Sequence, residues 1–272
     1  MQIHHIAIDS ICIDSLTGIY SILNELEIVK CKSYVRMEDE LLQAVSYAMQ
    51  RVILWRWYRA TNRTNNATIP SINRLNIMRC GNGRPQCPDV PGIHYNVSHS
   101  NGHVYLVEDT VNCGIDIEMY ERTNERTNER TNERTNERTN ERTNERTNER
   151  TNEPNHRHGR IIRETLGPRC MLQCSDLLGD EGVKCWTAIE SWLKYNSRGI
   201  GGLDDITVMR GTGGWFDAPF TVQQNGFRIA NQIDISASLP RDVFGTVTTA
   251  REGGDLTIEY HDIDLTELLK TI

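Results

Sequence analysis

The sequence contains no run of 18 apolar residues, no C-x-x-C pair and no excess of basic residues. Without such a run no membrane-spanning helix is expected, and the first nine residues lack the basic and apolar regions of a secretory signal. The eight cysteines have no zinc-ribbon or thioredoxin spacing, which predicts reduced thiols. The net charge of -7 argues against a general nucleic-acid binder. We therefore expect a cytoplasmic protein that binds neither membranes nor nucleic acid.

With 272 residues, 38% of them hydrophobic and 25% charged, the chain suffices for one large domain or two modest ones. Residues 121–152 differ from the rest, because they are eight tandem copies of Glu-Arg-Thr-Asn without an apolar residue. Such a segment cannot bury a core that offsets the entropy of ordering the chain. We interpret it as a solvated insertion with a weak helical tendency.

Hydrophobic periodicity predicts a mixture of helices and strands. The predicted helices span residues 16–29, 37 to about 59, 157–166 and 181–196, and the predicted strands span 3–8, 93–97 and 103–107, followed by short β-like runs after residue 206 and a final apolar element at 265–272. The strands at 93–97 and 103–107 are expected to form a hairpin with Ser98 and His99 at its tip. This pattern indicates an α+β fold.

Asp116 and Glu118 stand two residues apart within the apolar, β-prone segment 114–118. In a strand both side chains point to one face. Two neighbouring carboxylates repel each other unless a cation lies between them, and a hard ion such as Mg²⁺ is the natural candidate. The alternative is a strand that simply turns both acids to solvent.

Glu190 and Lys194 lie four residues apart on the helix predicted after the insertion, and therefore share one face. Alone, the pair is typical of a surface ion pair. Together with Asp116 and Glu118, Glu190 becomes a candidate third carboxylate for a metal ion, and Lys194 a candidate contact for an anionic substrate.

Three motifs, in this order, carry a family resemblance. They are Asn-Val-Ser-His-Ser at 96–100, Gly-Ile-Asp-Ile-Glu at 114–118 and Trp-Thr-Ala-Ile-Glu-Ser-Trp-Leu-Lys at 186–194. The set resembles that of the 4'-phosphopantetheinyl transferases, in the broad-specificity Sfp-like branch. Gly83-Arg84-Pro85 resembles the family's Gly-Lys-Pro, and residues 30, 38–39 and 51 fit its N-terminal helical region. Without the repeats, the separation of 67 residues between Glu118 and Trp186 becomes 35, which is similar to the family's separation.

The resemblance implies a pseudo-dimer of two similar α+β halves, here 1–110 and 111–272, each a small antiparallel sheet packed on a long helix. Coenzyme A would lie in the cleft between the halves. The implied reaction is a Mg²⁺-dependent transfer of the phosphopantetheine arm of coenzyme A to a serine of an apo acyl or peptidyl carrier protein, with release of 3',5'-ADP. Fatty acid or natural product biosynthesis would use it. A chain that supplies both walls of its cleft is expected to work as a monomer.

The resemblance also implies roles for individual residues. Asp116, Glu118 and Glu190 would hold Mg²⁺, and Glu190 would accept the proton of the carrier serine. Lys194 would stabilise the charge of the pyrophosphate. The residues implied to contact phosphates of coenzyme A are Arg84, Ser98 and His99, with Lys30 and Arg51 near the 3'-phosphate.

Three positions depart from the family pattern. Ile189 replaces a lysine that usually precedes the helix glutamate, and Glu27 and Leu42 stand where basic residues are common in relatives. These departures leave open a catalytically weak or inactive paralogue that binds coenzyme A or a carrier protein. A zinc site built from Cys80, Cys87, His94 and His99 is a further alternative, although its spacing fits no zinc pattern.

Overall fold

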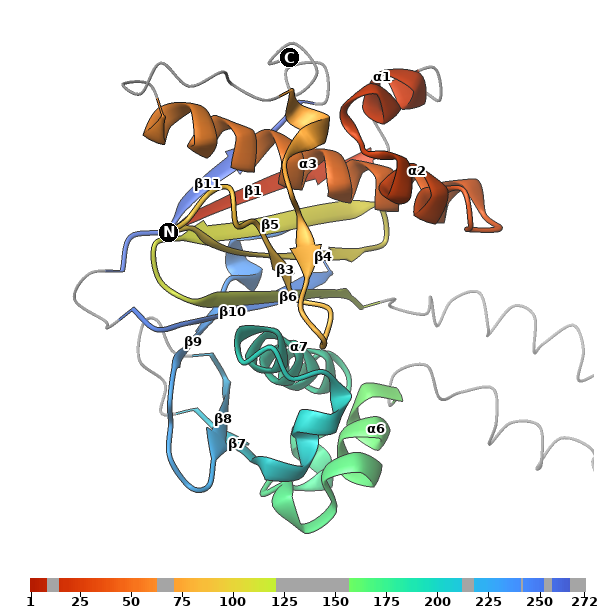
Figure 1. Ribbon diagram of the computed structural model, residues 1–272. Helices are drawn as coiled ribbons and strands as arrows, with labels where there is room; N and C mark the ends of the chain where they lie inside the picture. Colours follow the sequence, from red (N-terminus) through yellow and green to blue (C-terminus); the bar gives the residue numbers. More distant parts are fainter. Residues whose placement is uncertain are drawn as a thin grey trace, which may run out of the picture.

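The computed structural model describes residues 1–8, 15–62, 71–120, 157–211, 218–240, 242–251 and 256–264. It confirms the α+β class, since long helices pack on small sheets (Figure 1). The insertion at 121–152 and the apolar element at 265–272 lie outside the described residues. Within the described part, no helix has both the length and the apolar character needed to cross a membrane.

The N-terminal sheet has four strands in the order β11-β1-β5-β4. They are β1 (Gln2–Ala7), β4 (His94–Ser100), β5 (His103–Asp109) and β11 (Glu259–Asp262). β1 is antiparallel to β5 and parallel to β11. Helix α3 (Met37–Thr61) lies along one face of this sheet (Figure 1), and buried residues such as Val45, Met49 and Val52 recur at helical spacing on its inner side.

The helix predicted at 16–29 is in fact two helices, α1 (Ser15–Ile22) and α2 (Glu25–Cys31). The break occurs at Asn24, whose side chain accepts a hydrogen bond from the backbone N–H of Glu27, while the Glu27 carboxylate accepts one from the Asn24 N–H. This capping box begins a new helix. The apolar periodicity continued across the junction and concealed it.

The predicted β-hairpin is confirmed, but its tip is not where the sequence suggested. β4 continues to Ser100, so Ser98 and His99 lie within the strand. The turn consists of Asn101 and Gly102, which have φ values of 43° and 80°. Two positive φ values are typical of the type I′ turn, whose twist matches that of paired strands.

A second sheet has the order β6-β10-β9, formed by β6 (Cys113–Met119), β10 (Val243–Thr249) and β9 (Asn231–Asp234). Side chains alternate along β6. Ile115 and Ile117 join the core between the two sheets, whereas Gly114, Asp116 and Glu118 face helix α7 (Asp180–Tyr195). The two acids therefore do share one face, as a strand requires.

Helix α7 packs on the second sheet through small polar side chains. Thr187 and Ser191 are fully buried and bond the hydroxyls of Thr246 and Thr248 on β10, at 3.0 and 2.9 Å. The other side of α7 covers a core shared with α6 (Arg157–Leu166) and with the hairpin of β7 (Ile206–Arg210) and β8 (Phe220–Gln224). Ile189, one of the three family departures, is fully buried in that core.

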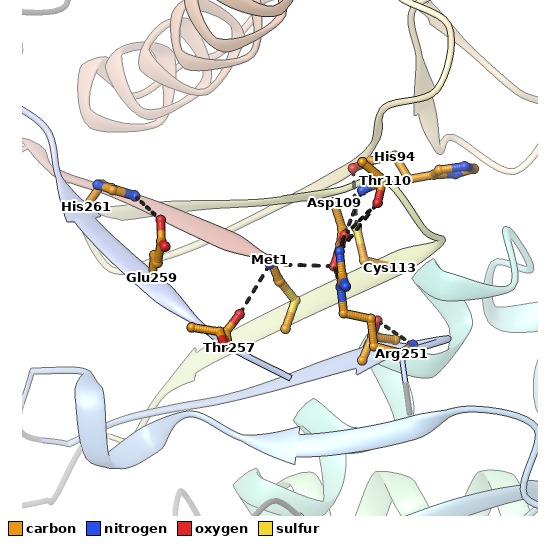
Figure 2. Close-up of polar contacts among 10 residues, drawn as sticks. Met1, His94, Asp109, Thr110, Cys113, Arg251, Thr257, Glu259 and His261 are labelled. Carbon is orange, nitrogen blue, oxygen red and sulfur yellow. Dashed lines mark hydrogen bonds and ion pairs between the residues drawn. The ribbon is translucent and has the colours of Figure 1, made fainter. Parts of the chain in front are cut away.

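An ion-pair cluster links the two sheets at the end of β5 (Figure 2). Asp109 is 4% exposed and accepts two hydrogen bonds from the guanidinium of Arg251, which follows β10. The amino group of Met1 lies 3.8 Å from the same carboxylate. Burial alone would raise the pKa of Asp109, but the Arg251 hydrogen bonds and the Met1 charge lower it below its ordinary value.

Candidate functional site

Helix α7 approaches β6 unusually closely because Gly114 has no side chain. A Cβ atom at this position would lie 2.3 Å from the Ser191 carbonyl oxygen and 2.5 Å from the Tyr195 backbone nitrogen. No real Cβ contact is that short, so only glycine permits this packing. The close approach places the last turn of α7, which carries Lys194, over Asp116.

Lys194 joins the two strands that form the floor of the site. Its Nζ atom donates to Asp116 Oδ1 at 2.6 Å and to Ser98 Oγ at 3.1 Å. Asp116 is 4% exposed, and its other oxygen, Oδ2, is buried with no hydrogen-bond partner. Only one of the two Asp116 carboxylate oxygens, Oδ1, therefore accepts hydrogen bonds.

Two serines of β4 contact the acids of β6. The Ser98 hydroxyl donates to Asp116 Oδ1 at 3.0 Å, and the Ser100 hydroxyl donates to Glu118 Oε2 at 3.4 Å. The hydroxyl oxygens of Ser98 and Ser100 also accept the backbone N–H groups of Ile117 and Met119, each at 3.2 Å. These contacts account for the alternating serines of the Asn-Val-Ser-His-Ser motif.

The acids and Lys194 line a single cleft of about 790 Å³. This volume lies within the range of small-molecule and cofactor sites. Its walls come from helices α2, α3 and α7 and from strands β4 and β6, and they carry both charge signs. The charged and titratable side chains of the lining are Lys30, Tyr47, Arg79, His99, Asp116, Glu118, Glu190 and Lys194.

Burial and the crowding of the carboxylates raise the pKa of both glutamates. Burial and the neighbouring Asp116 raise the pKa of Glu118 to about 7, although Lys194 acts in the opposite direction. The same two causes raise the pKa of Glu190. Burial and the Lys194 charge lower the pKa of His99, which favours its uncharged ring. The three carboxylates carry more formal negative charge than Lys194 alone neutralises.

The fit of a Mg²⁺ ion depends on the donor set and its arrangement. The donors are three carboxylates, which are the oxygen ligands that this ion prefers. The buried, unpartnered Oδ2 of Asp116 and the raised pKa values of both glutamates favour a cation beside these carboxylates. As they stand, however, no three His, Cys, Asp or Glu side chains in the described ranges converge closely enough to hold a metal. The three carboxylates are chemically suitable ligands for Mg²⁺, and one of their oxygens, Asp116 Oδ1, already accepts a hydrogen bond from Lys194.

The same observation bears on the zinc alternative. Among the residues that the structure describes, Cys80, Cys87, His94 and His99 do not form a metal-binding group. Cys87 and His94 line a separate cavity of about 470 Å³, whereas His99 lines the main cleft. The structure gives this alternative no support.

A second cavity of about 320 Å³ adjoins the cleft and shares Arg79, Glu190 and Lys194 with it. Arg84, from the Gly83-Arg84-Pro85 turn between β2 (Met78–Arg79) and β3 (Pro85–Gln86), lines this cavity. Its guanidinium donates to the Tyr195 carbonyl at 3.0 Å and to Ser197 Oγ at 3.3 Å. Arg84 thus ties its turn to the C-terminal end of α7.

Arg51 and Lys30, both expected near a 3'-phosphate, lie in different surroundings. Arg51 is fully buried and is not part of the cleft lining. It forms a bidentate ion pair with Glu27, with distances of 2.6 and 3.0 Å, and donates to the carbonyls of Ile72 and Leu75. Lys30 is exposed at the cleft and lies 5.3 Å from the ring of Tyr34.

The other two family departures now have a structural explanation. Glu27 pairs with Arg51 and caps α2, and Leu42 packs against the N-terminal core. Both residues contribute to the fold of the N-terminal layer.

The sequence did not single out Arg79, and it predicted no role for Ser100, which bonds Glu118 and the Met119 amide. Arg79 lines both cavities, donates to the Gly83 carbonyl at 2.8 Å and lies 5.7 Å from the ring of Tyr47. Its position four residues before Gly83 was the available signal, because the turn that contains Gly83 folds the chain back beside it.

Comparison with known proteins adds no family assignment. No protein-family model matches the chain, and no curated protein does either. The residues that line the cleft are therefore the observations that bear on the function of this protein.

Proposed function

We propose that the protein is a 4'-phosphopantetheinyl transferase that moves the phosphopantetheine arm of coenzyme A to a serine of an apo acyl or peptidyl carrier protein. One observation carries this proposal. Asp116 and Glu118 of β6 meet Glu190 and Lys194 of α7 in one cleft, together with His99 of the first motif. The three motifs that resemble the family in sequence thus contribute to a single site.

The carboxylates supply the chemistry of this reaction. Asp116, Glu118 and Glu190 would hold Mg²⁺, and the ion, when bound, would neutralise charge that develops on the pyrophosphate as its bond breaks. Glu190 accepts the proton of the carrier serine.

Cations around the acids would bind the phosphates of coenzyme A. Lys194 contacts the pyrophosphate, and Arg84, Arg79 and Lys30 bind the remaining phosphates from the walls of the two adjoining cavities. His99 lines the same cleft, and its lowered pKa favours the uncharged ring, which would donate a hydrogen bond without adding charge. Ser98, an expected phosphate contact, is already bonded to Asp116 and Lys194.

We also propose that the chain consists of two similar halves, 1–110 and 111–272. The support is that one long helix covers each sheet, α3 on the first and α7 on the second (Figure 1). β11 crosses this division, because it pairs with β1. Both walls of the cleft come from one chain, which supports a monomer.

The direct test is to incubate the protein with several apo carrier proteins, saturating coenzyme A and Mg²⁺, and to measure carrier mass. We expect the mass gain of one phosphopantetheine arm, lost on chelation of Mg²⁺ or in Asp116→Asn. Asp116→Asn is a matched control, since it keeps the size of the side chain and removes its charge. No gain on any carrier would overturn the proposal, and an equally active Asp116→Asn would overturn the metal assignment.

The second candidate is a non-enzymatic module that binds coenzyme A or a carrier protein. The pairing of Arg51 with Glu27 favours it, because this cation is buried away from the cleft. Each lost charged contact to a phosphate weakens binding by about 1.5 to 3 kcal/mol. Calorimetry distinguishes the two candidates: tight carrier binding without Mg²⁺-dependent mass gain identifies the module.

A further inference from the structure

Strands β4 and β6 lie side by side but belong to different sheets (Figure 1). β4 is an edge of the four-stranded sheet, and β6 is an edge of the three-stranded sheet. An edge strand presents backbone N–H groups that need acceptors, and burying such a group without one is costly. The acceptors at this β4–β6 junction are therefore informative.

Serine hydroxyls take the place of backbone carbonyls at the junction. Ser98 Oγ accepts the N–H of Ile117, and Ser100 Oγ accepts the N–H of Met119, both at 3.2 Å. The partners are two residues apart on each strand, which is the spacing at which successive groups of a strand point the same way. Two side chains of β4 thus bond two successive outward N–H groups of β6.

The same hydroxyls bond the acids that directly precede those amides in the chain. Ser98 donates its one hydrogen to Asp116 Oδ1 and accepts from both Ile117 N–H and Lys194 Nζ. A hydroxyl offers one donor and two acceptor sites, so Ser98 is fully used. Ser100 donates to Glu118 Oε2 at 3.4 Å while it accepts from Met119.

We infer that Ser98 and Ser100 are positioning residues whose hydroxyls join the two sheets at the β4–β6 junction and hold Asp116 and Glu118 toward the cleft. The β4–β6 junction does not depend on the proposed function. The second part of the inference, that the serines orient the acids toward a divalent ion, does rest on the proposed function. Partners that orient metal ligands affect metal affinity strongly even though they do not touch the metal. The inference replaces the expected phosphate contact of Ser98 with a role in geometry.

The junction is tested by amide hydrogen exchange, resolved by residue, in Ser98→Ala, Ser100→Ala and the corresponding threonine variants. We expect Ile117 to exchange at least about tenfold faster in Ser98→Ala, and Met119 in Ser100→Ala. Threonine keeps the hydroxyl and suits a strand, so it restores slow exchange. The Glu118 amide, which points toward β10 by strand alternation, reports whether the sheet remains intact.

Ser21→Ala is the matched control, because the Ser21 hydroxyl also forms a hydrogen bond with the backbone, donating to the Gly18 carbonyl, but lies on α1, away from the cleft. It should leave the exchange of Ile117 and Met119 unchanged. Unchanged exchange in Ser98→Ala or Ser100→Ala would overturn the junction, as would faster exchange throughout β6 that threonine does not correct.

The orienting role is tested with Mn²⁺ as the probe, by calorimetry on the full chain without coenzyme A. We expect about 10- to 100-fold weaker Mn²⁺ binding in Ser98→Ala and recovery in Ser98→Thr. Unchanged affinity, alongside faster Ile117 exchange, would overturn the orienting role and leave the junction standing. Absence of Mn²⁺ binding by the unaltered protein would overturn both the orienting role and the proposed function's metal site.

Discussion

Positive charge is scarce among the acids of the cleft. Lys194 is the cation that contacts Asp116, at 2.6 Å, and Glu118 and Glu190 both have raised pKa values. A site of this kind binds a proton or a cation more readily than a neutral cleft does. The ionisation of Glu118 should therefore be visible in the stability of the metal-free protein.

We expect the metal-free protein to lose stability as the pH rises from about 4.5 to about 7. The folded pKa of Glu118 is about 7, above its ordinary value of 4.5, so the folded state binds a proton that the unfolded state releases in this window. The loss is on the order of 1 to 3 kcal/mol, allowing for the partial exposure of the group. Urea unfolding at several pH values measures it.

Glu118→Gln is the control for this pH dependence. Glutamine does not titrate, so the difference between the unaltered protein and the variant isolates Glu118 from the histidines that ionise in the same range. A variant with the same pH slope as the unaltered protein would contradict the shift.

The buried Arg51–Glu27 pair gives a second prediction. Arg51→Met leaves the Glu27 carboxylate buried without its partner, and we expect a loss of about 3 to 5 kcal/mol in the free energy of unfolding. Adding Glu27→Gln should recover about 1 to 3 kcal/mol, since the amide is uncharged. Chemical denaturation of the two single variants and the double variant measures both. A stable Arg51→Met with a raised KM for coenzyme A would instead support the phosphate role implied by the family resemblance.

At the scale of elements, hydrophobic periodicity and turn residues predicted the type of an element, helix or strand, because these patterns depend on local backbone geometry. The strand at Asp116, the helix with Glu190 and the β4–β5 hairpin were predicted correctly in type. The break at Asn24 was missed because a capping box interrupts a helix without disturbing its apolar spacing. The bond between Lys194 and Ser98 could not be predicted, since it joins residues 96 positions apart. Its existence depends on how closely α7 packs.

That packing gives a prediction for Gly114. Gly114→Ala introduces a Cβ atom 2.3 Å from the Ser191 carbonyl oxygen, so α7 must shift away from β6. We expect a loss of about 1 to 3 kcal/mol in stability, as for other overpacked sites, and weaker coenzyme A binding because Lys194 moves. Gly201→Ala is the matched control, since no atom lies within 4 Å of its added Cβ. Equal stability of the two variants would contradict the close contact.

At the scale of the whole molecule, the repeats at 121–152 connect β6 to α6. Shortening the eight copies to two should raise the free energy of unfolding by about 1 kcal/mol, because a shorter connection loses less entropy on closure. Carrier modification should be unchanged. Urea unfolding and the mass assay check both statements, and a loss of modification with retained stability would assign the repeats a functional role.

The pairing of β11 with β1 has a consequence for biosynthesis. His5 and Asp262 form a hydrogen bond although 257 residues separate them. While the ribosome is still translating, the first sheet has β1, β4 and β5 available but must wait for residues 259–262 to emerge. During that interval the outer edge of β1 is open to other nascent strands, and contacts so distant along the chain form slowly. Residues 259–262 therefore complete this sheet late in folding.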